Sequence, residues 1–364
     1  MFSDKEINTG RQIEFDYAKG LFLLAILLIH SFQIAGRGAG SETEAFKIIY
    51  MIGVMTGAPI FMFVMGLGTR YRKAEAGEML RSGGRLILYQ YLNNIAHIVS
   101  IIMPYFVMQI FVDMSAHKEE VIETSKLFAL YINIFFLAGG IYFVLSLLKK
   151  FKTPIWIYVA LGLSINIFSP MLIGLNTGIA PVDYILGGIF GGMQYASFSI
   201  LNYLPYAFFG IAFGELLKRV VDKKRFYVIV CSCSTFIIAL FFFWVFWKYP
   251  GFDSFYSYID RTYTEPDFMR TIANTSAVAM LAGILFFVSD IITKCGVLHR
   301  LLMYYSKHIS KYYAIHPTFF FLAYGFNGFS GFGFWGCTVL FVLGMFYTDV
   351  IVRLYNRYWV KPIK

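Results

Sequence analysis

Long apolar runs recur along the whole 364-residue chain, and they constrain its fold more than any other feature. A helix needs about 20 mainly apolar residues to cross a bilayer. About ten runs approach that length, at residues 15–36, 46–68, 86–111, 126–148, 154–175, 199–217, 226–247, 271–293, 303–325 and 333–354. Only helices and closed barrels satisfy their backbone groups in lipid. The runs therefore predict an all-α fold, a polytopic integral membrane bundle of about ten transmembrane helices.

The composition agrees with a membrane environment. Charged residues make up 14% of the chain and aromatic residues 20%, whereas a soluble domain carries roughly 25% charged residues. No polar stretch is long enough for a separate soluble domain, so we predict a single membrane domain over residues 1–364. Residues 176–198 are interrupted by glycine and proline, and we expect a loop there that dips back into the protein.

Basic and acidic residues alternate between the loops that join the runs. The basic loops contain Arg70, Arg72, Lys73, Arg81 and Arg85, then Lys149, Lys150 and Lys152, then Lys218, Arg219, Lys223, Lys224 and Arg225, and finally Lys294 and Arg300. The other loops hold Asp113, Glu119, Glu120 and Glu123, and later Asp253, Asp260, Glu265 and Asp267. Basic loops face the cytoplasm, which predicts a multi-pass protein of the inner (plasma) membrane with both termini cytoplasmic.

The same distribution accounts for the net charge of +10. We therefore expect membrane lipid as a partner and no nucleic acid. The sequence leaves the oligomeric state open, with a homodimer as one option.

Several common chemistries have no support in the sequence. The cysteines are Cys231, Cys233, Cys295 and Cys337, which lie in or beside apolar runs and show no metal-binding spacing. No metal is expected. The sequence has no GxGxxG after a strand, no GxxxxGK[ST] loop, no GxSxG in a strand–turn–helix and no HExxH. Nucleotide hydrolysis and zinc hydrolysis are therefore not indicated.

Ionisable groups within apolar runs are costly and become site candidates for that reason. His30 lies in the outer part of the first run, and Lys19 precedes it by eleven residues. Eleven residues make about three helical turns, so the two side chains share a face about 16 Å apart. Asp16 lies three residues before Lys19 and can pair with it. Two roles for His30 fit this arrangement equally well. One is a chemical role, and the other is a hydrogen bond to a neighbouring helix that serves packing.

His316 is the second buried candidate, and Tyr312 lies one helical turn before it. Pro317 follows, weakens the local helix and frees a carbonyl, which suits a cavity wall. A purely structural role is the plainer interpretation. Asn93 and His97 are four residues apart on one face of the third run, where buried amides more often join helices than bind ligands.

The second run contains Pro59, Gly66 and Gly68. Pro59 predicts a kink toward a cavity. The two glycines predict close helix packing, because small residues let backbones approach each other.

Three motifs taken in order resemble the transmembrane acyltransferase superfamily. The first is Arg11-Gln12-Ile13-Glu14-Phe15-Asp16-Tyr17-Ala18-Lys19-Gly20, with His30 at the family's distance from the basic residue. The second is Ala58-Pro59-Ile60-Phe61-Met62-Phe63-Val64-Met65-Gly66. The third is the late segment Tyr305-Ser306-Lys307-His308-Ile309-Ser310-Lys311-Tyr312-Tyr313-Ala314-Ile315-His316, which ends in Tyr-x-x-His. Together they extend over nearly the whole chain.

Two branches of that superfamily fit the motifs. One is the acyltransferase-3 branch, which modifies surface polysaccharides, and the other is the heparan-α-glucosaminide N-acetyltransferase-like branch. The blocks Ala58-Pro59-Ile60-Phe61 and Leu204-Pro205-Tyr206-Ala207-Phe208-Phe209-Gly210 look more like the second branch, and the remaining motifs fit either.

The resemblance implies transfer of an acetyl or other acyl group from cytosolic acyl-CoA, as co-substrate, to a sugar or glycan acceptor. His30 would be the catalytic base, with an acyl-histidine intermediate as the alternative route. Lys19 and Asp16 would hold the inner mouth of a channel, and His316, Asn93 and Tyr312 would contact substrate. Arg72 and Arg85 would attract the CoA phosphates, although the topology of the basic loops by itself accounts for most of the arginines there.

Two other functions use the same residues. A transporter or flippase could move a solute or a lipid-linked sugar through the polar interior, with the buried histidine and lysine as a proton relay. A structural membrane subunit is the third interpretation, in which neither His30 nor His316 affects any activity.

Overall fold

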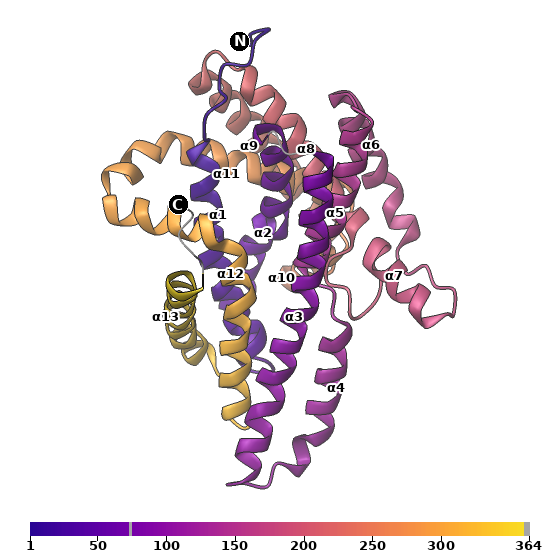
Figure 1. Cartoon of the computed structure of the whole chain (residues 1–364), viewed down its shortest axis with the longest axis vertical. Coiled ribbons are helices and arrows are strands. Elements are labelled where there is room, and N and C mark those ends of the chain that lie inside the picture. Colours follow the sequence, from indigo (N-terminus) through magenta and orange to yellow (C-terminus); the bar gives the residue numbers. More distant parts are fainter. Residues whose placement is uncertain (73–74, 360–364) are drawn as a thin grey trace. The chain divides into compact units, whose positions relative to one another are not determined.

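A computed structural model describes residues 1–72 and 75–359 of the chain. It shows a protein built from helices (Figure 1). Within these ranges no strand forms, and the extended backbone makes two isolated bridges only. Eight of the described helices are long and apolar enough to cross a membrane. The all-α membrane bundle is therefore confirmed in outline, whereas the number of ten spans is not. Lys73 of the first basic loop lies outside the described residues.

The chain forms two compact units, which we describe separately. The first comprises Met1–Ala18, Val54–Gln90 and Tyr131–Lys294, and the second comprises Lys19–Gly53, Tyr91–Leu130 and the chain from Cys295 onward. Three of the unit boundaries fall within helices, namely α1 (Ile13–His30), α2 (Glu44–Tyr71) and α3 (Ala76–Gln109). That the whole chain is one domain stays a prediction.

The first unit consists mainly of paired helices. Besides its parts of α1, α2 and α3, it contains α5 (Ile134–Lys150), α6 (Ile155–Phe168), η4 (Ser169–Leu172), α7 (Ala180–Phe190), α8 (Ile200–Arg219), α9 (Lys223–Lys248), α10 (Phe252–Thr264) and α11 (Phe268–Lys294). Helix α9 packs along α11, and α6 packs along α8.

Glycines bring α2 and α8 into backbone contact. A Cβ atom on Gly66 would overlap the carbonyl of Ala207, and one on Gly210 would overlap the carbonyl of Phe63. The close packing expected at Gly66 is confirmed, whereas a Cβ atom on Gly68 would meet nothing within 4 Å. Helix α2 also bends where the sequence places Pro59, since Gly57 leaves the helical region with φ −25° and ψ −123°.

The prediction that residues 126–148 form one continuous helix is wrong. Non-helical backbone separates α4 (Lys118–Leu130) from α5, and its polar groups find partners elsewhere in the first unit. The Ile132 amide donates to the Tyr195 carbonyl at 2.6 Å, and the Asn133 amide donates to Gln90 Oε1 at 3.1 Å. The segment 176–198, expected as a loop, contains the eleven-residue helix α7.

The second unit is organised around two long helices, α12 (Gly296–Phe326) and α13 (Phe334–Tyr358), which pack against each other. It also contains η1 (Ser31–Ala35), η2 (Gly40–Glu42), η3 (Ser115–His117) and α4. Helix α12 covers the expected span 303–325, but polar residues such as Lys311 and His316 keep it outside the set of eight apolar helices.

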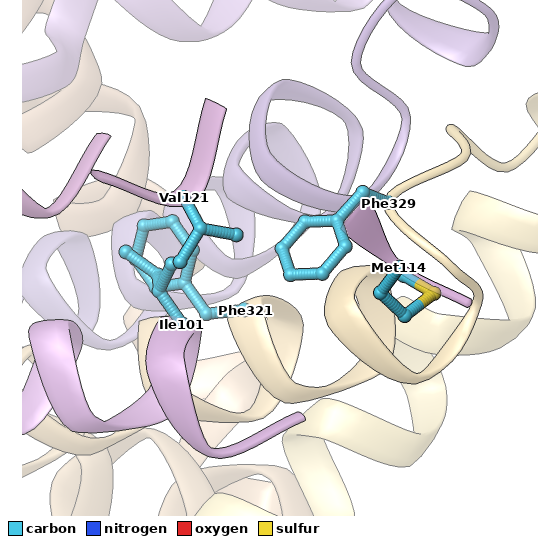
Figure 2. Packing of buried hydrophobic residues seen from close by; sticks show 5 residues of the cluster. All are labelled: Ile101, Met114, Val121, Phe321 and Phe329. Carbon is cyan, nitrogen blue, oxygen red and sulfur yellow. The ribbon is translucent and has the colours of Figure 1, made fainter. Parts of the chain in front are cut away.

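An apolar cluster joins α3, α4 and the end of α12 within the second unit. Figure 2 shows its five buried members, which are Ile101, Met114, Val121, Phe321 and Phe329. A hydrogen bond also joins α12 to α4 in this region, because the Tyr324 hydroxyl donates to Glu120 at 2.9 Å. The cluster fixes α12 against α3 just beyond the histidines described below.

Candidate functional site

His30 lies where α1 changes its winding. It is the last α-helical residue of α1, and the π-helical segment η1 follows directly. Short π segments inside helices are rare and often mark functional positions. Segment η1 packs against both α12 and α13, so the end of α1 is held within the second unit.

His316 on α12 meets His30 directly. The His30 Nδ1 atom lies 2.7 Å from His316 Nε2. The two rings are nearly parallel, with centroids 4.9 Å apart and an interplanar angle of 16°. His316 is fully buried, whereas His30 retains partial exposure. The structure thus brings together the two histidines that the sequence placed first among its candidates.

The hydrogen bonds define the tautomers of this pair when both rings are neutral. His316 Nδ1 lies 2.8 Å from the Tyr312 carbonyl, which can only accept, so the Nδ1–H of His316 donates. His316 Nε2 is then an acceptor, and the Nδ1–H of His30 donates to it. The Nε2 atom of His30 consequently keeps its lone pair, which is what a general base requires.

Tyr312 supports the histidine pair in two ways. Its backbone carbonyl accepts from His316, and its side chain contacts α13. Its buried hydroxyl donates to Asp349, whose other carboxylate oxygen accepts from Arg353 Nε at 2.5 Å. The expected substrate-binding hydroxyl of Tyr312 is therefore engaged with Asp349. Asp349 is not among the residues predicted from the sequence, although it is a lone carboxylate within the apolar run 333–354 and so is costly there for the same reason as the histidines.

Asn93 and His97 form a neighbouring polar pair on α3. The Asn93 amide nitrogen lies 3.2 Å from His97 Nε2, and the imidazole packs against Phe128 and Phe321. Since an amide NH₂ can only donate, His97 carries its proton on Nδ1. That atom is buried and has no hydrogen-bond partner within residues 1–72 and 75–359.

The candidates on the first half of α1 divide between the units. Asp16, in the first unit, is buried and accepts from Arg11 Nε at 2.6 Å. The hydrogen bond to Asp16 raises the pKa of Arg11, which precedes the membrane span. Lys19, in the second unit, is partly buried and lies on the same helix as His30, eleven residues before it.

Arg72 and Arg85 are exposed and belong to the first unit. Arg72 directly follows α2, and Arg85 lies within α3. The histidine pair belongs to the second unit, and the part of the two arginines in binding CoA stays a prediction.

Among the described residues, histidine, cysteine and carboxylate side chains form no group of three that could hold a metal ion. No family model, curated protein or solved structure matches this chain. The residues themselves are therefore the basis for a functional assignment. Two hydrogen-bonded histidines, one fully buried and the other partly exposed with a defined acceptor nitrogen, can remove a proton from a bound hydroxyl or amine.

Proposed function

We propose that this protein is a membrane acyltransferase that moves an acetyl or other acyl group from acyl-CoA to a sugar hydroxyl or amine, with His30 as the general base. The observation that carries the proposal is the 2.7 Å contact between His30 Nδ1 and His316 Nε2. The order of the Lys19–His30, Pro59–Gly66 and Tyr312–His316 motifs supports the same assignment.

In this reaction the acceptor oxygen or nitrogen attacks the thioester carbonyl while His30 Nε2 takes the acceptor's proton. The carbon–sulfur bond then breaks, CoA leaves as a thiolate, and the proton passes from His30 to the sulfur. The imidazolium formed on His30 keeps its Nδ1–H bond to His316, so the pair holds the ring in one orientation throughout. Atoms and charge balance without a further reactant.

His316 acts in this scheme as a positioning residue. Because Tyr312 fixes the Nδ1–H of His316, the Nε2 atom of His316 is held as an acceptor. Asp349 in turn anchors Tyr312 to α13. These contacts support a role for both α12 and α13 in orienting the base.

The proposal is tested by release of free CoA from acetyl-CoA by the purified full chain, measured with and without a panel of amino sugars and neutral sugars. We expect release that depends on the added sugar. If the protein instead exchanges an unmodified solute across proteoliposomes and releases no CoA, it is a transporter and the proposal is wrong.

A further inference from the structure

Basic residues outnumber acidic ones on the two long helices of the second unit. The lysines and arginines of α12 and α13 are Arg300, Lys307, Lys311, Arg353 and Arg357. Asp349 is the only carboxylate on either helix. All of these basic residues except Arg300 form what we call the α12–α13 basic cluster. It lies on the side of the helices that the loop charges predict to be cytoplasmic.

Tyr304 of α12 and Asn356 of α13 join the two helices within the cluster. Asn356 Nδ2 donates to the Tyr304 hydroxyl at 3.2 Å, and the Lys311 ammonium donates to Asn356 Oδ1. The guanidinium carbon of Arg353 lies 4.5 Å from the centre of the Tyr304 ring. A lysine of α12 and an arginine of α13 therefore converge on the same pair of residues.

Most of the positive charge of the cluster has no carboxylate beside it. Arg353 is the only member that forms an ion pair within the described residues, through its Nε atom and Asp349 at 2.5 Å. Lys311 is only partly exposed, and it contacts a neutral amide and a tyrosine ring. Lys307 and Arg357 are exposed, each one helical turn from another member. A partly buried ammonium without a counterion is costly, so an external anion would stabilise the cluster.

Exposed aromatic residues adjoin the cluster at the end of α13. They are Tyr355, Tyr358 and Trp359. Lys311 Nζ lies 4.6 Å from the centre of the Tyr355 ring, and the Arg357 guanidinium carbon lies 5.5 Å from that of Tyr358. Tyrosine and tryptophan are enriched where a membrane meets water. These residues indicate that the cluster lies at the depth of the lipid headgroups.

We propose that the α12–α13 basic cluster binds the phosphate of an anionic phospholipid, with phosphatidylglycerol as the probe. Lys311 and Arg353 contact the phosphate where the two helices meet, and the two exposed cations attract it. An arginine fork suits a phosphate, and basic sites between transmembrane helices on the cytoplasmic side favour anionic headgroups. The adjoining aromatic residues favour a lipid over a soluble phosphate compound. The inference does not depend on acyl transfer by His30.

Hydrogen bonds connect this site to the histidine pair. Asp349 accepts from Arg353 Nε and from the Tyr312 hydroxyl. The Tyr312 carbonyl in turn accepts from His316 Nδ1. A headgroup that holds Arg353 in place therefore also stabilises the contact of α12 with α13 that supports the pair.

The proposal is tested first with the natural full chain in two kinds of nanodisc at one ionic strength. One contains only neutral phosphatidylcholine, and the other also contains phosphatidylglycerol. We expect phosphatidylglycerol to raise the melting temperature by about 3–6 °C and to stay bound in native mass spectrometry. Equal melting temperatures in the two membranes, or loss of all phosphatidylglycerol from the protein, would overturn the proposal.

Two double variants separate this site from the general attraction of a basic inner face. Lys311→Gln/Arg357→Gln removes two charges of the cluster and leaves its ion pair intact. Lys150→Gln/Lys224→Gln removes two exposed charges of the first unit and changes the net charge equally. We expect the first variant to weaken retention of phosphatidylglycerol at least about tenfold and the second to change it less than about twofold. Equal effects would contradict the assignment.

CoA is the soluble alternative, because it also carries phosphates. Free CoA would be titrated into the protein in phosphatidylcholine nanodiscs, with the natural chain and with Lys311→Gln/Arg357→Gln. We expect the two proteins to respond to CoA alike. A rise in melting temperature with CoA that the variant abolishes would assign the cluster to the soluble compound and overturn the lipid assignment.

Discussion

His316 is tied to its own helix, because its Nδ1 atom lies 2.8 Å from the carbonyl oxygen of Tyr312 one turn earlier. This bond decides which nitrogen of His316 faces His30, and through it which nitrogen of His30 is free to accept a proton. A backbone carbonyl cannot change its role with pH, so the orientation is built into α12.

Replacing His316 tests its positioning role. His316→Gln can keep an acceptor toward His30, whereas His316→Leu cannot. We expect the kcat of acyl transfer to fall by roughly 10- to 100-fold in the Leu variant and by less in the Gln variant, with the KM for acyl-CoA little changed. Steady-state kinetics at several pH values would also show a shifted pH profile in the Leu variant. Equal loss in both variants would mean that His316 contributes packing only.

His308 offers a control for that experiment. It lies on α12 like His316, but at the kink where φ is −111° and ψ is 15°, and its ring packs against Tyr304. We expect His308→Gln to leave the pH profile of acyl transfer unchanged.

The hydrogen bond from Tyr312 to Asp349 should be measurable as a coupling free energy. Bonds to a charged group contribute about 1.5–3 kcal/mol, and this one joins α12 to α13. Tyr312→Phe, Asp349→Asn and the double variant form a double-mutant cycle, read by unfolding in a mixed-detergent titration. Strictly additive losses would show that the two groups act independently.

Two glycines of α2 give opposite predictions for the same substitution. Gly66→Ala would place a methyl group against the Ala207 carbonyl, and we expect a loss of about 1–3 kcal/mol from overpacking. Gly68→Ala has open space and should stabilise the helix by up to about 1 kcal/mol. Melting temperatures of the two variants would test this, and destabilisation by Gly68→Ala would contradict it.

The orientation inferred from loop charge can be tested by labelling with a membrane-impermeant maleimide. Cys295 is exposed between α11 and α12, and Ser254 is exposed on α10. In intact cells we expect Ser254→Cys to be labelled and Cys295 to react only after permeabilisation. Labelling of Cys295 from outside would invert the topology.

The helical membrane bundle could be predicted in outline from the apolar runs alone. The exceptions depend on contacts between segments that are far apart in the sequence. The break between α4 and α5 was missed because Ile132 and Asn133 satisfy their backbone through Tyr195 and Gln90, which are distant in sequence. Such long-range partners leave no trace in the apolar pattern of residues 126–148.

In the candidate site, too, the sequence predicts the individual residues but not the contact between them. His30 and His316 could be selected because an imidazole within an apolar run is costly. Their contact spans 286 residues of sequence, and nothing in either segment predicts it.

Transfer of radiolabelled acetyl from acetyl-CoA to a sugar acceptor, compared between the natural protein and His30→Ala in equal folded amounts, tests the central claim most directly. Removing a general base should slow transfer by roughly 100- to 10,000-fold. We predict a loss in that range with the melting temperature of the variant close to that of the natural protein. A variant that folds and transfers acetyl at the natural rate would contradict the assignment of His30.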